Sequence, residues 1–245
     1  MDITLGTWRV SIQRIPPTSA ELAALYDCAA HSWQGGLRLL GFPRAYADLF
    51  ARLQDDGALG SLQRGAWALD CGIGTAAFSL ALAEQLVTPV RIEGIDIAPQ
   101  MLDQARRALD AAGVPADLRR GDVRDLPFAD QTFDLVMSAH MLEHLVDPRA
   151  ALREMTRVLR PRASLLVVVT RRGICGALVG LKYRCASIDP AALVSWMEDA
   201  GLADVRQYDI TTGPSVARLM SVACVGRKKE EQPCYSKVTV SGHNV

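Results

Sequence analysis

The stretch that decides the fold is ALDCGIGTAAFSLAL, residues 68–82. An apolar run ends at Asp70, two glycines follow at Gly72 and Gly74, and an apolar helical pattern begins directly after them. This pattern is typical of a buried strand that turns tightly into a helix. In open α/β sheets, ligands bind at such strand ends, where the free N–H groups of the helix start add donors.

Strand and helix patterns alternate on both sides of this stretch. We expect strands at 66–71, 90–96, 133–139 and 163–170, another strand ahead of residue 121, and helices at 46–53, 75–87, 99–112, 147–160 and 189–201. The last strand candidates, 204–211 and 218–226, lack a helix-sized segment between them and predict an antiparallel pair at one edge. The sequence therefore predicts an α/β fold, a doubly wound and mostly parallel sheet with helices on both faces.

The first quarter of the chain shows a helical pattern. Thr18 and Glu21 predict a capping box that opens a helix, and Gly35-Gly36 are expected to end it near Gln34. We expect three parts: an N-terminal helical cap at 1–60, a core at 61–226, and a polar, disordered tail at 227–245.

Composition limits the partners. Lys plus Arg and Asp plus Glu both number 27, and a net charge of zero gives no support for nucleic-acid or membrane binding. The six cysteines form no C-x-x-C pair, which argues against zinc. No signal-peptide pattern and no membrane-length apolar run occurs. We expect a cytoplasmic, soluble monomer or homodimer with no nucleic-acid partner and no stable membrane insertion.

Two ligand classes fit the glycine loop. Gly72-x-Gly74-x-x-Ala77 matches the dinucleotide fingerprint of dehydrogenases. Asp70 favours the other class, because a carboxylate directly before the loop would repel a pyrophosphate and attract an ammonium or a sulfonium. The chain also has no Y-x-x-x-K pair for hydride transfer. The sequence therefore favours a cationic ligand over NAD.

Two further acids follow the next strands. Asp96 could accept hydrogen bonds from both hydroxyls of a ribose, or it could only cap the following helix. Ile97 and Met101 are placed to flank an adenine, or belong to the core. Asp122 could accept from an adenine amino group and the Val123 N–H could donate to the ring; the alternative is a turn aspartate.

The segments ALDCGIGTAA, IEGIDIAPQML, GDVRDLPFADQTFDLVMSAHMLEHLVDP and LREMTRVLRPRASLLVVV resemble class I S-adenosylmethionine-dependent methyltransferases of the small-molecule, quinone or natural-product type. The resemblance covers about residues 65–170 and continues more weakly to the last strands. It implies a seven-stranded, Rossmann-like sheet whose last strand is antiparallel, with S-adenosyl-L-methionine as the cofactor.

By motif position, the resemblance assigns Asp70, Gly72 and Gly74 to the methionine part of the cofactor, Asp96 to the ribose, and Asp122 and Val123 to the adenine. One departure is Ala76, where many members carry a third glycine. Alanine is small, so we expect binding to survive with a slightly different backbone.

Candidates for chemistry lie in SAHMLEHL, residues 138–145. If this segment is helical, His140, Glu143 and His144 share one face. It also resembles the E-x-x-E-H segment of quinone-pathway O-methyltransferases, with His140 in place of the first Glu. Three interpretations stay open: Glu143 and His144 orient the loop, His140 or His144 acts as a base, or the three bind a metal. We take the three as catalytic candidates and predict no metal.

Two segments could shape the acceptor pocket. LYDCAAHSW resembles a Y-D-x-x-A-x-x-W segment of small-molecule methyltransferases, so Tyr26 and Trp33 could close over the cofactor, or pack as an ordinary amphipathic helix. The apolar residues 174–181 could receive an apolar molecule with an anionic group, or form an ordinary lid helix. Basic residues flank this run: Arg171, Arg172, Lys182 and Arg184.

The resemblance implies methyl transfer to a small molecule, which the apolar run 174–181 suggests is apolar, at an oxygen, carbon or nitrogen atom. The alternatives are a macromolecule methyltransferase and a non-catalytic S-adenosylmethionine-binding protein. The sequence shows no N-P-P-Y motif and no basic extension that would favour a macromolecule. It also keeps the acids that a non-catalytic relative would be expected to lose.

Overall fold

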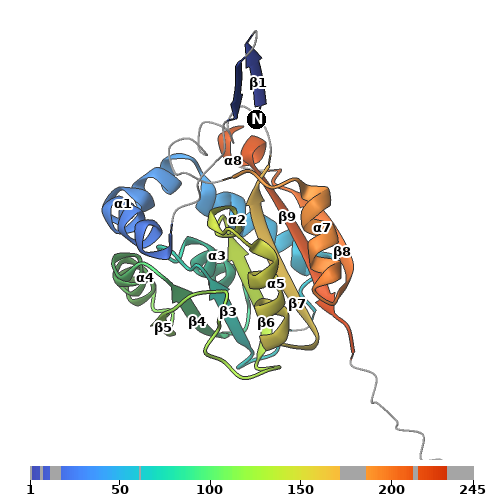
Figure 1. Cartoon of the computed structure of the whole chain (residues 1–245). Coiled ribbons are helices and arrows are strands. Elements are labelled where there is room, and N and C mark those ends of the chain that lie inside the picture. The colour runs from blue at the N-terminus through green and yellow to red at the C-terminus, as the bar shows by residue number, and fades with distance from the viewer. Residues whose placement is uncertain are drawn as a thin grey trace, which may run out of the picture.

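The computed structural model describes residues 2–5, 8–11, 18–60, 62–171, 186–211 and 215–230. Its main sheet contains β3 (Trp67–Cys71), β4 (Arg91–Asp96), β5 (Ala116–Arg120), β6 (Phe133–Ala139), β7 (Leu159–Thr170), β8 (Leu202–Asp209) and β9 (Ser221–Lys228). The strand order is β5-β4-β3-β6-β7-β9-β8 (Figure 1). β9 runs antiparallel to both of its neighbours, and the other pairs are parallel. The predicted seven-stranded, doubly wound sheet is confirmed.

Helices cover both faces of this sheet. They are α1 (Ser19–Leu39), α2 (Phe42–Asp55), α3 (Ala77–Gln85), α4 (Pro99–Ala111), α5 (Pro148–Val158), α7 (Pro190–Asp199) and α8 (Ser215–Met220), with a 3-10 turn η1 (Leu142–His144). Successive strand residues point to opposite faces, so Ala68 and Leu135 pack with α2 and α3, whereas Leu69 and Val136 pack with α5 and α7. Figure 1 shows these two helical layers on either side of the strands.

The switch point of the strand order lies between β3 and β6. The chain leaves β3 towards β4 and β5 on one side, then returns to build β6 and β7 on the other. The carboxyl ends of β3, β4 and β6 therefore meet at the crevice where doubly wound sheets bind ligands.

Helix α1 begins as predicted and ends later than predicted. The Thr18 hydroxyl accepts from the Glu21 N–H at 3.3 Å, and the Glu21 carboxylate accepts from the Thr18 N–H at 2.8 Å. The expected stop at Gly35-Gly36 is wrong, because the helix continues to Leu39. A helical glycine costs only about 1 kcal/mol relative to alanine, and packing of Leu37 and Leu40 against the core outweighs that cost.

Other boundaries also differ from the sequence predictions. Helix α5 ends at Val158 and not Arg160, because β7 begins at Leu159 and continues through Pro161. The short helix α8 lies in the connection in which no helix was expected, whereas the predicted antiparallel pair at one edge of the sheet is confirmed as β8 and β9.

Both ends of the chain extend beyond the predicted core. Strands β1 (Asp2–Leu5) and β2 (Trp8–Ser11) form an antiparallel pair within the part expected to be helical. β9 extends to Lys228, and residues 231–245 of the expected tail lie outside the described residues. None of the helices in the described part of the chain is long and apolar enough to cross a membrane.

Candidate active site

A cavity of about 330 Å³ lies at the carboxyl ends of β3, β4 and β6. It is walled by the glycine loop after β3, the strand ends, η1, and side chains from α1 and α2. The structure brings every predicted site residue to this one cavity: Asp70, Gly72, Gly74, Asp96, Ile97, Met101, Asp122, Val123, His140, Glu143 and His144. Residues that are up to 74 positions apart in the chain therefore share one site.

The glycine loop adopts left-handed backbone conformations. Gly72 has a φ of 76°, and a Cβ there would lie 2.5 Å from Cγ of Met141. Gly74 has a φ of 52°, and a Cβ there would meet nothing closer than 4.0 Å. Ala76 keeps the same kind of turn at φ 62°, which costs about 1 kcal/mol for a residue with a side chain. The loop thus keeps a tight turn although it lacks the third glycine.

Asp70 is buried behind this loop. Its side chain is 1% exposed, and Oδ2 accepts a hydrogen bond of 2.7 Å from the Ser79 hydroxyl. Burial raises the pKa of Asp70 to about 7, against the lowering effect of Ser79 and with a further increase from the charge of Asp96. A cation placed beside this carboxyl would favour its ionised form.

Asp96 links the glycine loop to the start of α4. Oδ2 accepts from the Gly74 N–H and Oδ1 from the Ala98 N–H, both at 2.9 Å. Burial raises the pKa of Asp96 although these backbone bonds oppose the change. Each carboxylate oxygen has two lone pairs, so acceptor capacity remains for a ligand in the cavity.

The loop after β5 contains an ion pair that the sequence analysis missed. Arg124 donates to both oxygens of Asp122, from Nη2 at 2.6 Å and from Nε at 2.9 Å. The Arg124 N–H also donates to Asp122 Oδ1 at 3.0 Å, which is the turn geometry that was left open as the alternative. Both side chains are about one third exposed. The D-x-R spacing was the available signal.

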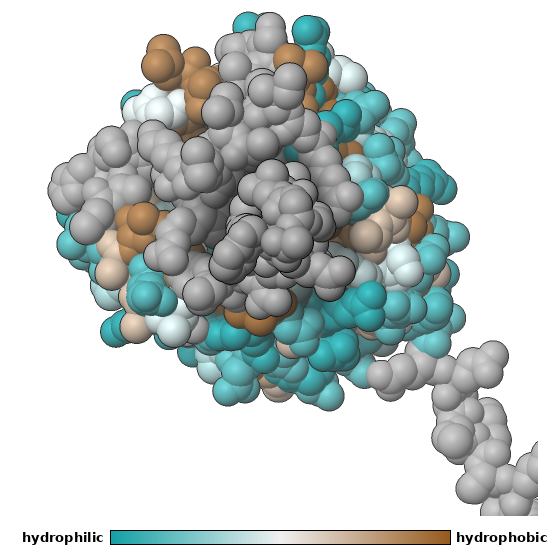
Figure 2. All heavy atoms as spheres, turned by 45° about the horizontal axis from the view of Figure 1, so that its top comes forward, coloured by the Kyte–Doolittle hydropathy of each residue, from teal (hydrophilic) through white to brown (hydrophobic). Residues whose placement is uncertain are grey.

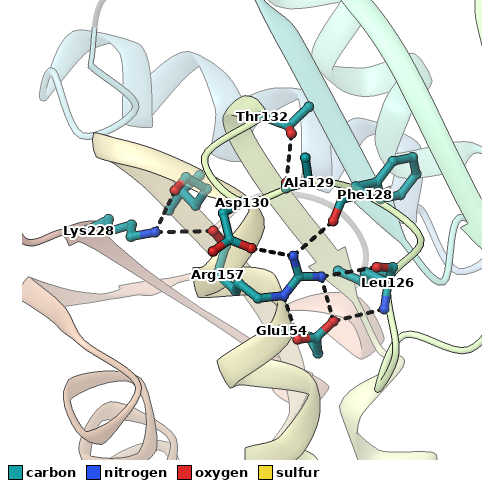
Figure 3. A network of polar contacts seen from close by, with 9 residues as sticks. Leu126, Phe128, Ala129, Asp130, Thr132, Glu154, Arg157 and Lys228 are labelled. Atoms are coloured by element: carbon teal, nitrogen blue, oxygen red, sulfur yellow. Dashed lines mark hydrogen bonds and ion pairs between the residues drawn. The ribbon is translucent and has the colours of Figure 1, made fainter.

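Arg157 on α5 fastens the far end of this loop. Its guanidinium donates to the carbonyls of Leu126 and Phe128 and to the carboxylates of Asp130 and Glu154 (Figure 3). Glu154 in turn accepts from the Leu126 N–H at 2.9 Å. The part of the loop that follows Asp122 and Val123 is therefore fixed to α5 by a side chain outside the cavity.

The three catalytic candidates do not lie on one helix face. His140 has a φ of 55° and precedes η1, which contains only Glu143 and His144 of the three. Nδ1 of His140 is 3.0 Å from the Thr170 hydroxyl and 3.2 Å from Glu143 Oε1, and Nε2 is 3.2 Å from the Ser221 hydroxyl. Both ring nitrogens thus have protein partners.

His144 contacts helix α1. Its Nε2 lies 2.7 Å from the Tyr26 hydroxyl, and the two rings meet edge to face. Next to Tyr26, the Asp27 carboxylate accepts from the Gln100 N–H at the start of α4. Tyr26 lines the cavity as proposed from the sequence, while the Trp33 side chain lies outside the described residues.

Glu143 is the most deeply buried of the three candidates. Oε1 accepts from the Thr170 N–H at 2.6 Å, and Oε2 has no hydrogen-bond partner among the described residues. Burial raises the pKa of Glu143, but the hydrogen bond from His140 and the charges of His140 and His144 outweigh it, so the pKa lies below its ordinary value. Among the described side chains, no group of three ligands surrounds a common metal position.

The walls of the cavity differ from those predicted for the acceptor pocket. Residues 172–185, with Arg172, Lys182 and Arg184, lie outside the described residues, and Arg171 pairs with Asp209. The sequence analysis missed the contribution of α2, from which Phe42 and Tyr46 line the cavity. The predicted helix at 46–53 began at Tyr46 and left Phe42 outside it, whereas α2 begins at Phe42, so the spacing of four between the two residues was the available signal.

Sequence comparisons relate this chain to known methyltransferases. Residues 69–167 match a family model described as a methyltransferase domain. The demethylmenaquinone methyltransferase of Clavibacter sepedonicus is 31% identical over 195 residues, which cover 69% of this chain and 78% of that protein. Several other matches cover less than half of this chain and about half of the relative.

Solved structures share the fold. The (4+2)-cyclase SpnF superposes with a TM-score of 0.68 at 20% identity, covering 88% of this chain and 97% of that chain. Phosphoethanolamine N-methyltransferase 2 of Haemonchus contortus, in complex with S-adenosyl-L-methionine, gives 0.59 at 14% identity, covering 73% and 52%. At these identities the likeness concerns the fold alone, and the sequence relatives carry the assignment. The chain belongs to the class I S-adenosylmethionine-dependent methyltransferase family.

Proposed function

We propose that this protein transfers a methyl group from S-adenosyl-L-methionine to a small, largely apolar molecule held in the cavity. One observation carries the proposal: the eight residues predicted to bind the cofactor line a single cavity together with His140, Glu143 and His144. A donor site and an acceptor site that share one cavity are what direct group transfer requires.

The residues present fit the cofactor. Asp70 offers a buried carboxyl that a positive group would ionise, which suits the methionine ammonium. Gly74 has open space where a side chain would stand, so a ligand can approach the backbone there. Asp96 would hold the ribose, with Ile97 and Met101 beside the adenine and Asp122 and Val123 at its edge. When bound, the cofactor supplies an electrophilic methyl group on a sulfonium.

Apolar side chains beyond the predicted cofactor residues also line the cavity, namely Leu37, Leu40, Met141, Leu145 and Met220. Large exposed hydrophobic residues follow or precede three of them in the chain, namely Leu39, Val146 and Leu219. Among the residues coloured by hydropathy in Figure 2, separate apolar areas lie within a larger hydrophilic surface. An apolar acceptor, such as the quinones of the demethylmenaquinone methyltransferases that this chain resembles, fits this lining.

The polar cluster would orient the acceptor. His140 is better suited to holding Glu143 than to taking a proton, because both of its nitrogens already have protein partners. His144 and Tyr26 join α1 to η1 and would close the cavity over the bound molecules. The prediction that a histidine acts as base stays a prediction.

We also infer a cytoplasmic monomer or homodimer without a nucleic-acid partner. Cys71 and Cys224 are free, buried thiols, as expected in a reducing compartment. The balanced charge, 27 residues of each sign, supports neither DNA nor RNA binding.

Titration calorimetry tests the function. The purified protein should bind S-adenosyl-L-methionine and S-adenosylhomocysteine and should not bind NAD. Tight NAD binding with no response to S-adenosyl-L-methionine would overturn the proposal, because the glycine loop alone is compatible with a dinucleotide.

A further inference from the structure

The first observation concerns the second oxygen of Glu143. The side chain is almost completely buried, and the Thr170 N–H and His140 Nδ1 both approach Oε1. Oε2 is buried without any hydrogen-bond partner in the described part of the chain, although Glu143 lines the cavity. A buried carboxylate oxygen without a donor is unfavourable, so it indicates that a ligand donates to it.

The second observation concerns Tyr46 on α2. Its ring packs against Phe42 and Phe78, with centroid distances of 5.5 and 4.8 Å, and this packing fixes its direction. Tyr46 lines the cavity, and none of the hydrogen bonds among the described residues uses its hydroxyl. Burial and the charges of Glu143 and Asp70 raise the pKa of Tyr46 above its ordinary value. The phenol is therefore a neutral O–H donor.

We propose that Glu143 and Tyr46 hold the reacting group of the methyl acceptor, and that this group is a hydroxyl. A hydroxyl oxygen carries one proton and two lone pairs. The proton fits Glu143 Oε2, one lone pair accepts from Tyr46, and the other stays free to attack. A neutral amine has a single lone pair, which the Tyr46 donor would occupy, and a methyl ether has no proton for Glu143. This inference rests on the proposed function.

The step balances within this site. The hydroxyl oxygen forms a bond to the methyl carbon, and the carbon–sulfur bond breaks with its electron pair remaining on sulfur. The hydroxyl proton moves to Glu143 Oε2 as the oxygen gains positive charge, and the low pKa of Glu143 then lets that proton pass to water. His140 and Thr170 are positioning residues, since they hold Oε1 and leave Oε2 as the oxygen that is available to the acceptor.

Matched probe molecules test the acceptor class, and their binding is measured without turnover. The protein is saturated with S-adenosylhomocysteine and titrated with a triplet of probes that differ only in the reacting group: 2-naphthol, 2-naphthylamine and 2-methoxynaphthalene. Further triplets of a hydroxyl, an amine and a methyl ether on other apolar ring systems follow. Ligand-observed NMR gives the affinities. Hydroxyl members should bind at least about tenfold more tightly than their ether partners, which have no proton for Glu143, and this is the effect of one charge-assisted hydrogen bond. Amine members can bind through the same two residues, but Tyr46 then holds their lone pair, so only the hydroxyl members should be methylated when S-adenosyl-L-methionine replaces S-adenosylhomocysteine. Equal or weaker binding of the hydroxyl members relative to their ether partners, or no binding of any triplet, would overturn the inference.

Three variants connect this preference to the two residues. Glu143→Gln should reduce the preference for hydroxyl over ether members at least about fivefold, and Tyr46→Phe should weaken the binding of the hydroxyl members by a similar factor, while S-adenosylhomocysteine binding persists in both. Tyr208→Phe is the matched control, because Tyr208 is buried outside the cavity, and it should leave both the preference and the affinity unchanged. An unchanged hydroxyl affinity in a folded Tyr46→Phe protein would refute the role of Tyr46. Failure of S-adenosylhomocysteine to bind would instead refute the proposed function, so the two failures are distinguishable.

Discussion

Replacing Asp70 by asparagine should stabilise the ligand-free protein and weaken its hold on the cofactor. The folded-state pKa of about 7 lies above the ordinary value of 3.8 that the unfolded chain retains. Folding therefore favours the protonated carboxyl. The resulting stability is complete below pH 3.8, falls by about 1.4 kcal/mol per pH unit above it, and is lost once the pH exceeds 7. The cost of holding the ionised form is then about 4 kcal/mol.

Asparagine has nearly the same shape and carries no charge, so it avoids that cost. A weaker hydrogen bond from Ser79 offsets about 1 kcal/mol, which leaves a net gain of about 3 kcal/mol at pH 8. Near pH 4 the gain should disappear. Denaturant unfolding without ligand at both pH values measures the difference, and Asp110→Asn on the exposed face of α4 serves as the control.

The same variant tests the ligand side of the argument. Cofactor affinity of the natural protein should rise from pH 5.5 to pH 8 as Asp70 ionises, and this dependence should be lost in Asp70→Asn together with at least about tenfold in affinity. A variant that is less stable than the natural protein at pH 8 would show that the carboxylate is not penalised by burial, and the reasoning would fail.

The remaining predictions test separate parts of the site. Asp96→Ala should weaken S-adenosyl-L-methionine binding at least about tenfold in a protein that still folds, and calorimetry that finds unchanged affinity would place the ribose elsewhere. Gly72→Ala should destabilise the protein by more than about 2 kcal/mol, because the left-handed turn and the contact with Met141 both oppose a Cβ. The control Gly113→Ala, at φ 66° with open space around it, should cost only about 1 kcal/mol. Equal unfolding midpoints of the two variants would contradict this account. Tyr26→Phe should speed amide hydrogen exchange in α1, because the hydrogen bond from Tyr26 to His144 is lost. Unchanged exchange would show that this hydrogen bond does not hold α1 against η1. Arg157→Ala should lower stability by about 2 kcal/mol because it removes part-buried hydrogen bonds to the carbonyls of Leu126 and Phe128, and a loss below about 0.5 kcal/mol would show that the network of Figure 3 contributes little to stability.

The elements and residues that depend on local sequence were predicted well. β6 has the predicted bounds, Phe133–Ala139, because its apolar run is bordered by polar residues on both sides. The capping box at Thr18 is likewise a local pattern. The strand-end acids were found because parallel strands deliver their carboxyl ends to one edge of the sheet.

What the sequence analysis missed depends on distant contacts. The passage of α1 through Gly35-Gly36 depends on core packing that no window of sequence contains. The place of Tyr46 in the cavity follows from how α2 lies on α3, and the unpartnered oxygen of Glu143 follows from the approach of Thr170 on a neighbouring strand. The roles of the site residues remain predictions, because they concern ligands.

The close approach of Gly72 to Met141 joins the two halves of the cavity. Gly72 belongs to the loop that would bind the donor, and Met141 directly follows His140, which would lie beside the acceptor. A movement of either loop is therefore passed to the other through van der Waals contact. Such linkage is reciprocal: if the donor raises acceptor affinity by some factor, the acceptor raises donor affinity by the same factor. Screening for acceptors in the absence of the donor would then underestimate their affinities, by the same factor with which the acceptor strengthens donor binding.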